Sequence, residues 1–311
     1  MDFINTNENT ELLKMDTNDL NILLNLLNEY DLELRDNLNL NKNITFGIEI
    51  ESEFADIINI ENEIELKGLK NTWQLKDDYT LDNGIEISSP ILKDDSKTYK
   101  EIELVCNIFK KYSKIGAHSG GHIHIGSQIL ESEHNILALV NFWSLFEHVI
   151  YRFTNGEYLN IRPSADLYAT PLRCLSLPSP YNFSKYNNVM VDSCIRLCNI
   201  SSFKNKKTRN TIEFRSPNGT FEPVIWQNNL NLFTKMIEKV KTIDVEKLYY
   251  DYFSNFSISV NEYNKIYFED AIRFADLIFD KNIDKMYFLR QYLKNNDVSN
   301  RYVKTKRFVN V

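Results

Sequence analysis

The chain of 311 residues has little glycine, proline or cysteine and contains no long apolar run. Its nine Gly and seven Pro exclude a collagen-like chain or one dominated by linkers. No apolar run approaches the ~20 residues that a membrane-spanning helix requires. The N-terminal residues also lack the basic and apolar regions of a secretory signal. We therefore expect a globular protein that has no membrane partner and resides in the cytoplasm.

Four cysteines are present: Cys106, Cys174, Cys194 and Cys198. A chain of this size does not need disulfides to fold, and nothing in the sequence points to secretion, so we expect reduced thiols. Cys194 and Cys198 have the spacing of one half of a zinc site, but no second pair completes it. We interpret them as small apolar side chains packed in the core.

Basic side chains are outnumbered by acidic ones, 36 to 43, which gives a formal net charge of -7. Nucleic-acid binding depends on Lys and Arg at the phosphates, so an acidic chain without a long basic run argues against a nucleic-acid partner. Hydrophobic residues make up 43% of the chain, which is ordinary for a globular protein and sufficient for a full core.

Hydrophobic periodicity divides the chain into three parts: a helical N-terminal appendage (1–43), a sheet-containing body (44–222) and a helical C-terminal part packed on the body (223–311). In the appendage, four leucines from Leu20 to Leu27 recur at helical spacing after a cap at Asp16 or Thr17. Further helices are predicted at 97–113, 133–153, 223–242, 245–256, 262–280 and 284–295.

Four short segments share an unusual strand pattern, in which Ile or Phe alternates with charged residues: 46–53, 84–90, 121–126 and 211–216. Because side chains of a strand point alternately to opposite faces, each segment has one apolar and one polar face. A solvated face is the ordinary interpretation of one such strand. Across the four, however, the polar side chains are Glu49, Glu51, Glu53, Glu86, His122, His124, Glu213 and Arg215.

Carboxylates that converge on one surface repel one another, and bound divalent cations offset that repulsion most simply. Carboxylate oxygens suit hard ions such as Mg2+ or Mn2+, and an arginine beside them suits a phosphate. The pattern therefore predicts a metal and phosphate site on the concave face of an antiparallel sheet.

Five motifs follow one another in the order found in a known family. They are Phe46–Glu51, Trp73 with Asp78–Leu81, Gly84–Pro90, Ser119–Gly126, and Thr211–Arg215 with Gly219 and Thr220. Over residues 44–240 the chain resembles the amidoligases, which are carboxylate–amine ligases of the glutamine synthetase-like fold. The resemblance implies an α+β fold whose antiparallel sheet carries a concave catalytic face and is flanked by helices.

The same resemblance implies a role for each matched residue. Glu49, Glu51, Glu86, His122 and Glu213 correspond to metal ligands. Arg215 corresponds to the arginine at the transferred phosphate, while Arg162 and Arg196 fall where such enzymes contact nucleotide phosphates or the substrate carboxylate. His124 is expected beside the nucleotide, and Asp78 or Glu53 is a candidate for the carboxylate that takes a proton from the attacking amine.

The implied activity is an ATP- and Mg2+-dependent ligase, with Mn2+ as an alternative cation, that forms an amide through an acyl phosphate. Its substrates would be a carboxylate and an amine, on a peptide, a protein or an amino acid. Two alternatives stay open: a zinc hydrolase built on His122 and His124, and a catalytically inactive scaffold. The sequence decides neither the substrate pair nor the oligomeric state.

Overall fold

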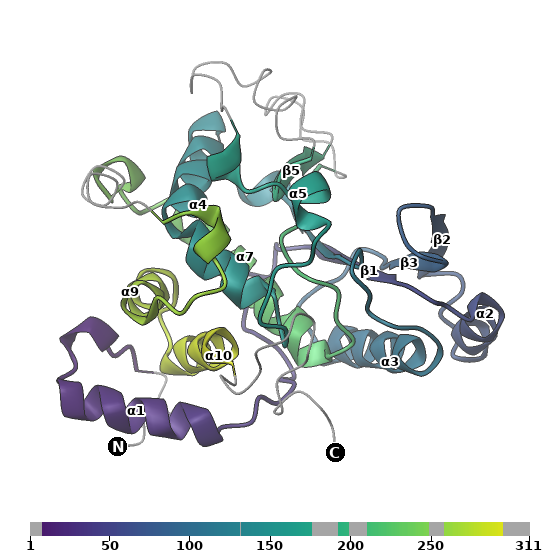
Figure 1. Ribbon diagram of the computed structural model, residues 1–311, viewed down its shortest axis with the longest axis horizontal. Helices are drawn as coiled ribbons and strands as arrows, with labels where there is room; N and C mark the ends of the chain where they lie inside the picture. Colours follow the sequence, from purple (N-terminus) through teal and green to yellow (C-terminus); the bar gives the residue numbers. More distant parts are fainter. Residues whose placement is uncertain (1–7, 131, 176–191, 199–209, 249–257, 295–311) are drawn as a thin grey trace.

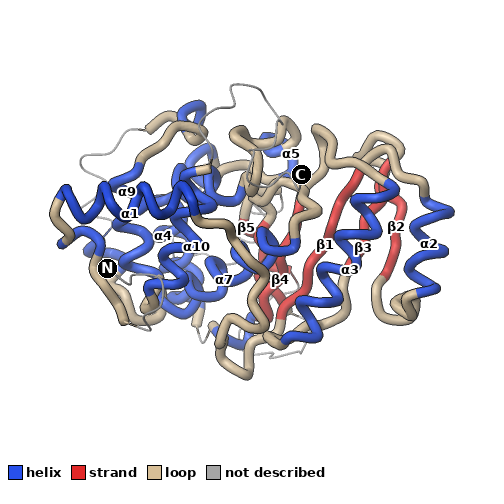
Figure 2. The backbone as a smooth tube through the Cα atoms, turned by 90° about the horizontal axis from the view of Figure 1, so that it is seen from below, coloured by secondary structure: helices blue, strands red, loops and turns tan. Residues whose placement is uncertain are grey.

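The computed structural model of the protein describes residues 8–130, 132–175, 192–198, 210–248 and 258–294. A six-stranded antiparallel sheet lies beside a bundle of helices (Figures 1 and 2). Its strands are β1 (Phe46–Ser52), β2 (Gln74–Asp78), β3 (Gly84–Ser88), β4 (Gly121–Gly126), β5 (Ile195–Cys198) and β6 (Thr211–Phe214). The described helices are α1 (Thr17–Glu29), α2 (Ile57–Leu66), α3 (Ser96–Tyr112), α4 (Glu133–Thr154), α5 (Ala165–Tyr168), α7 (Pro223–Lys239), α9 (Phe268–Ile278) and α10 (Asn282–Leu293). Single 3-10 turns occur at η1 (Leu12–Lys14), η2 (Ser127–Ile129), η3 (Leu172–Cys174) and η4 (Val260–Glu262).

Local signals start the longer helices. The side chains of Asp16, Asp56, Asp95 and Ser132 each accept a hydrogen bond from the backbone N–H three residues on, at the first turns of α1 to α4. Each such cap satisfies one of the N–H groups that a helix start leaves unpaired. α7 begins instead with Pro223, whose fixed φ suits the first helical position.

The sheet buries its apolar face. Ile48, Ile50, Ile85, Ile87, Ile123, Ile125, Ile212 and Phe214 all have at most 1% of their surface exposed. Three aromatic rings fix the packing of α4 and α7 on β6: Phe214 stacks on Phe233 with 4.2 Å between centroids, and Trp143 lies 5.8 Å from Phe214. In Figure 1, α3 runs below the sheet and α5 lies on the opposite side, above it.

The N-terminal and C-terminal segments pack against each other at the helical end of the molecule, where α1 runs beside α10 (Figure 1). The carboxylate of Asp276 in α9 accepts the backbone N–H groups of Leu12 and Leu13, both at 3.0 Å. It also pairs with the fully buried ammonium of Lys285 in α10 at 2.7 Å. Leu12 and Leu13 are therefore anchored by polar contacts as well as by the buried side chain of Leu12.

The predicted mixture of helices with an antiparallel sheet is confirmed. The predicted helix 262–280 begins later than expected, at Phe268, because the backbone of Tyr267 is not helical and its N–H donates to the hydroxyl of Tyr292. Most of the predicted helix 245–256 lies outside the described residues. β2 was not anticipated, since it holds a single apolar residue, Leu75, and pairs with β3 through its backbone. The division into three parts stays a prediction.

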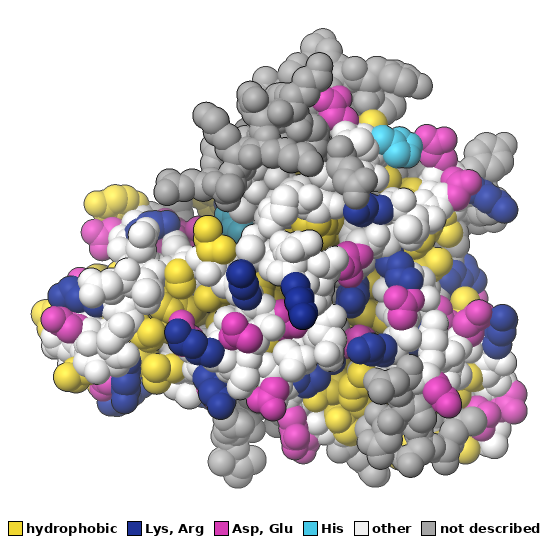
Figure 3. Space-filling model, turned by 180° about the vertical axis from the view of Figure 1, so that it is seen from behind, with side chains coloured by type: hydrophobic (Ala, Val, Ile, Leu, Met, Phe, Trp, Pro, Cys, Tyr) yellow, Lys and Arg dark blue, Asp and Glu magenta, His cyan; other side chains and the backbone are white. Residues whose placement is uncertain are grey.

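The described surface is mixed in charge. Figure 3 shows Lys and Arg side chains interspersed with Asp and Glu over one face of the molecule. Within the described residues, each helix is too short or too polar to cross a bilayer.

Replacing Asp276 with Asn should lower the free energy of unfolding by about 3–5 kcal/mol, because it leaves the buried Lys285 ammonium without its anion. The matched control is Asp280→Asn. Asp280 is 67% exposed and pairs with Lys239, so its loss should change stability by less than about 1 kcal/mol. Urea unfolding of both variants measures the difference; equal effects would show that the Asp276 pair does not anchor the N-terminal segment.

Candidate functional site

The register of the sheet brings the predicted polar residues into adjacent rows. Glu49 of β1 lies opposite His122 of β4, and His124 of β4 lies opposite Glu213 of β6. On the other side of β1, Glu51 faces Glu86 of β3. Residues that are 164 positions apart in sequence therefore share one face because neighbouring strands hold them there.

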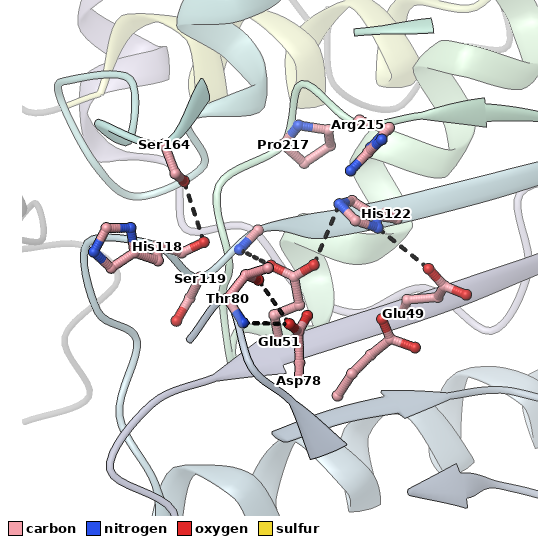
Figure 4. A network of polar contacts seen from close by, with 12 residues as sticks. Glu49, Glu51, Asp78, Thr80, His118, Ser119, His122, Ser164, Arg215 and Pro217 are labelled. Carbon is pink, nitrogen blue, oxygen red and sulfur yellow. Dashed lines mark hydrogen bonds and ion pairs between the residues drawn. The ribbon is translucent and has the colours of Figure 1, made fainter. Parts of the chain in front are cut away.

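These side chains open into one pocket of about 250 Å3. Its lining residues are Glu49, Glu51, Asp78, Thr80, Glu86, His118, His122, Arg162, Tyr168, Arg196, Glu213 and Arg215. Of the eleven candidate site residues named from the sequence, His124 and Glu53 are outside this lining. Figure 4 shows the imidazole of His122 pointing between Glu49 and Glu51, with Arg215 beyond it.

The first candidate cation site joins β1, β4 and β6. Glu49, His122 and Glu213 each offer one ligand atom, and these atoms lie within 4.8 Å of one another. Nδ1 of His122 is 3.2 Å from Glu49 Oε2 and 3.5 Å from Glu213 Oε1. Two carboxylate oxygens and one imidazole nitrogen make a donor set that fits Mg2+ or Mn2+.

The second candidate cation site is made of oxygen alone, from Glu51, Asp78 and Glu86, again within 4.8 Å. Asp78 accepts the backbone N–H of Thr80 at 2.8 Å, which orients its carboxylate at the end of β2. Glu86 pairs with Lys76 of the neighbouring strand at 3.0 Å. The ammonium of Lys76 therefore supplies part of the positive charge beside this triad.

Charge balance in the site depends on the two histidines. Burial by itself would raise the pKa of Glu49, but hydrogen bonds from His122 and His124 hold that pKa well below its usual value. Burial likewise opposes the charge on His122, yet the neighbouring Glu51, Glu49 and Glu213 raise its pKa. The lowered pKa of Glu49 and the raised pKa of His122 both favour the charged forms, so opposite charges are favoured in close contact here.

Glu213 is the carboxylate that connects the two ends of this face. Burial would raise its pKa, but His122, His124 and Arg215 lower it. Its Oε1 is 3.5 Å from Arg215 Nε, and its Oε2 is 3.7 Å from Arg196 Nη1. Arg215 is half-buried, whereas Arg196 is exposed at the edge of the sheet, so both guanidinium groups can reach an anion in the pocket.

Arg162 also lines the pocket, but its guanidinium is built into the wall. Nη2 donates to the carbonyl of Arg215 at 2.9 Å, and Nη1 donates to the carbonyls of Ser216 and Pro217. Only 3% of the residue is exposed. These bonds hold the backbone that follows β6. Arg162 therefore positions Arg215.

The glycines of the loop before β4 allow buried groups to approach the backbone. The N–H of Gly120 donates to Glu51 Oε2 at 2.6 Å, and a Cβ at this position would lie only 3.0 Å from that oxygen and from the Arg162 guanidinium. Glu53 accepts the N–H groups of His118 and Ser119 at 2.7 and 3.1 Å. Glu53 is therefore a loop anchor outside the pocket, and Asp78 is the better placed of the two candidate bases.

Three residues of the pocket escaped the sequence analysis: Thr80, His118 and Tyr168. Thr80 lies within the Asp78–Leu81 motif, but the sequence assigned it no role. His118 lies in the loop before β4 and Tyr168 ends the four-residue helix α5, so no periodic pattern linked them to the strands. Their proximity to the site results from the tertiary structure.

Comparison with family models gives no match, and comparison with curated protein sequences gives none either. Among solved structures the chain is similar to one described as a novel glutamine synthase homolog, with 11% identity and a TM-score of 0.41. That similarity covers 88% of this chain and 68% of the other.

Replacing Arg162 with Lys should reduce the free energy of unfolding by about 1–3 kcal/mol, because a lysine cannot satisfy the three carbonyls that the guanidinium fork reaches. Arg196→Lys is the control: this side chain is 44% exposed, and the change should stay within about 0.5 kcal/mol. Chemical denaturation distinguishes the two. A neutral Arg162→Lys change would remove the wall-positioning role.

Proposed function

We propose that the protein is an ATP- and Mg2+-dependent ligase that joins a carboxylate to an amine. The observation that carries the proposal is the pair of adjacent triads on one sheet face, flanked by Arg215 and Arg196. Hard-ion ligands beside guanidinium groups are the combination that phosphoryl transfer requires. The order of motifs along the strands, which resembles that of the amidoligases, supports the same chemistry.

The two triads would hold two cations against the phosphates of ATP. Glu49, His122 and Glu213 would form one site, and Glu51, Asp78 and Glu86 the other. The bound cations would neutralise and orient the phosphate oxygens. Carboxylates held on strands rather than on loops keep such a site in place between turnovers.

Arg215 is placed to bind the phosphoryl group in transfer, with Arg162 keeping its backbone in position. The substrate carboxylate oxygen attacks the γ-phosphorus, and the bond from that phosphorus to ADP breaks. The amine nitrogen then attacks the resulting acyl phosphate, and inorganic phosphate leaves. The proton that the amine loses would pass to Asp78 once that carboxylate has released its cation.

The two substrates would be a carboxylate and an amine carried by a peptide, a protein or a free amino acid. Screening of carboxylate and amine pairs for release of ADP would identify them.

Binding of Mg2+ with a non-hydrolysable ATP analogue should raise the melting temperature by several degrees, since a ligand at about 100 times its Kd adds about 2.7 kcal/mol to stability. The shift should need both components and disappear in Glu213→Ala. Glu103→Ala, on the exposed side of α3, should retain it. Thermal unfolding with EDTA, with Mg2+ alone and with Zn2+ alone provides the reference conditions for this measurement.

The other outcomes of the thermal-unfolding measurement would support one of the two alternative functions. Stabilisation by Zn2+ that depends on His122, without any nucleotide response, would direct the search to hydrolysis at His122 and His124. The absence of any response would favour a non-catalytic scaffold.

With a substrate pair in hand, Glu49→Ala and Glu213→Ala should each lower kcat by about 10^2–10^3-fold, because each removes charge stabilisation of the transferred phosphoryl group. Release of ADP and of the amide product measures the rate, and Glu103→Ala is again the control. Wild-type rates in both site variants would disprove the ligase mechanism.

A further inference from the structure

We propose that His124, Cys198 and Glu213 form a third metal site, selective for a thiophilic divalent cation such as Zn2+ and distinct from the two triads proposed for Mg2+. Ligand atoms of these three residues lie within 4.8 Å of one another. The site is at the β4–β6–β5 end of the sheet, outside the residues that line the ATP pocket except for Glu213.

The three ligands come from three neighbouring strands. His124 lies opposite Glu213 in the pairing of β4 with β6, and Cys198 ends β5 opposite Thr211. The thiol of Cys198 donates to Glu213 Oε2 at 3.1 Å. The ring of His124 is oriented by Thr211, whose hydroxyl is 3.1 Å from Nδ1. Strand pairing thus places a thiol, an imidazole and a carboxylate together without any rearrangement of the backbone.

The donor set differs in kind from those of the two triads. One sulfur, one nitrogen and one oxygen suit zinc, which takes three protein ligands and keeps a fourth position open in its non-structural sites. A thiolate discriminates strongly in favour of such ions, whereas Mg2+ prefers oxygen. The other described cysteines are placed differently: Cys106 and Cys194 are buried, and Cys174 is exposed at the end of η3.

Glu213 links this site to the proposed catalytic triad, because its two oxygens face different ways. Oε1 lies on the side of His122 and Arg215, while Oε2 lies on the side of Cys198 and Arg196. A cation bound at Oε2 shares the carboxylate with any cation at Oε1 and repels it. Zinc at the third site should therefore weaken Mg2+ binding at Glu49, His122 and Glu213. This consequence, unlike the site itself, rests on the proposed function.

Cobalt reports directly on the thiolate ligand. Titration of the full chain with Co2+, without nucleotide, should produce a thiolate-to-cobalt charge-transfer band in the near ultraviolet that saturates at one equivalent, and Zn2+ should abolish it. Cys198→Ser should remove the band and weaken Zn2+ binding by at least about tenfold, because loss of even an outer-shell partner of a metal ligand costs 10–100-fold. Cys174→Ser is the matched control and should retain the band.

Alkylation supplies a second measurement on the wild-type chain, which does not depend on the folding of any variant. Zn2+ should slow the reaction of Cys198 with iodoacetamide and leave that of Cys174 unchanged, as followed by peptide mass. A band that survives in Cys198→Ser, a band lost in Cys174→Ser, or an unprotected Cys198 would overturn the site.

The antagonism with Mg2+ has its own readout. Zn2+ added before Mg2+ and the ATP analogue should reduce the nucleotide-dependent thermal shift in the wild type and not in Cys198→Ser. A cobalt band without any nucleotide response would keep the third site and remove the ligase proposal. A nucleotide response without a cobalt band would do the reverse.

Discussion

Three glutamates surround the ring of His122 on a face of the sheet that is largely closed to water, and the rest of the site is arranged around that contact. Glu49, Glu51 and Glu213 each come within 3.5 Å of a ring nitrogen. Carboxylates at this density repel one another unless positive charge lies between them. The neighbouring carboxylates raise the pKa of His122, which favours the cationic ring that offsets their charge.

The surroundings keep the charged face in place. On the opposite side of the strands, isoleucines and stacked aromatic rings bury the apolar face against α4 and α7. On the polar side, Arg162 and the Gly120 N–H give fixed hydrogen bonds to the backbone after β6 and to Glu51. These contacts limit how far Glu51 and the backbone at Arg215 can move away from the other charged groups.

Alternation in the four strands was enough to predict which residues share the polar face, and most of them line one pocket. The sequence also predicted where two helices begin, from the cap at Asp16 and from the proline at the start of α7. The contributions of the loops and of the short helix α5 were not predicted. Glu53 follows the strand pattern but anchors the 116–119 loop, while His118 and Tyr168 reach the pocket without any sequence pattern. Strand β2, which carries Asp78, forms through backbone pairing with β3, and its side chains show no alternating pattern that would predict a strand.

The sequence by itself determined the chemistry of the polar face, because a period of two separates Glu, His and Arg from Ile wherever the strands lie. Only the tertiary structure decided the partners. Strand order and register, which depend on non-local pairing, set Glu49 against His122 and Glu51 against Glu86. They also brought Cys198, read from the sequence as a packed core thiol, to within 3.1 Å of Glu213, because β5 pairs with β6 at the sheet edge.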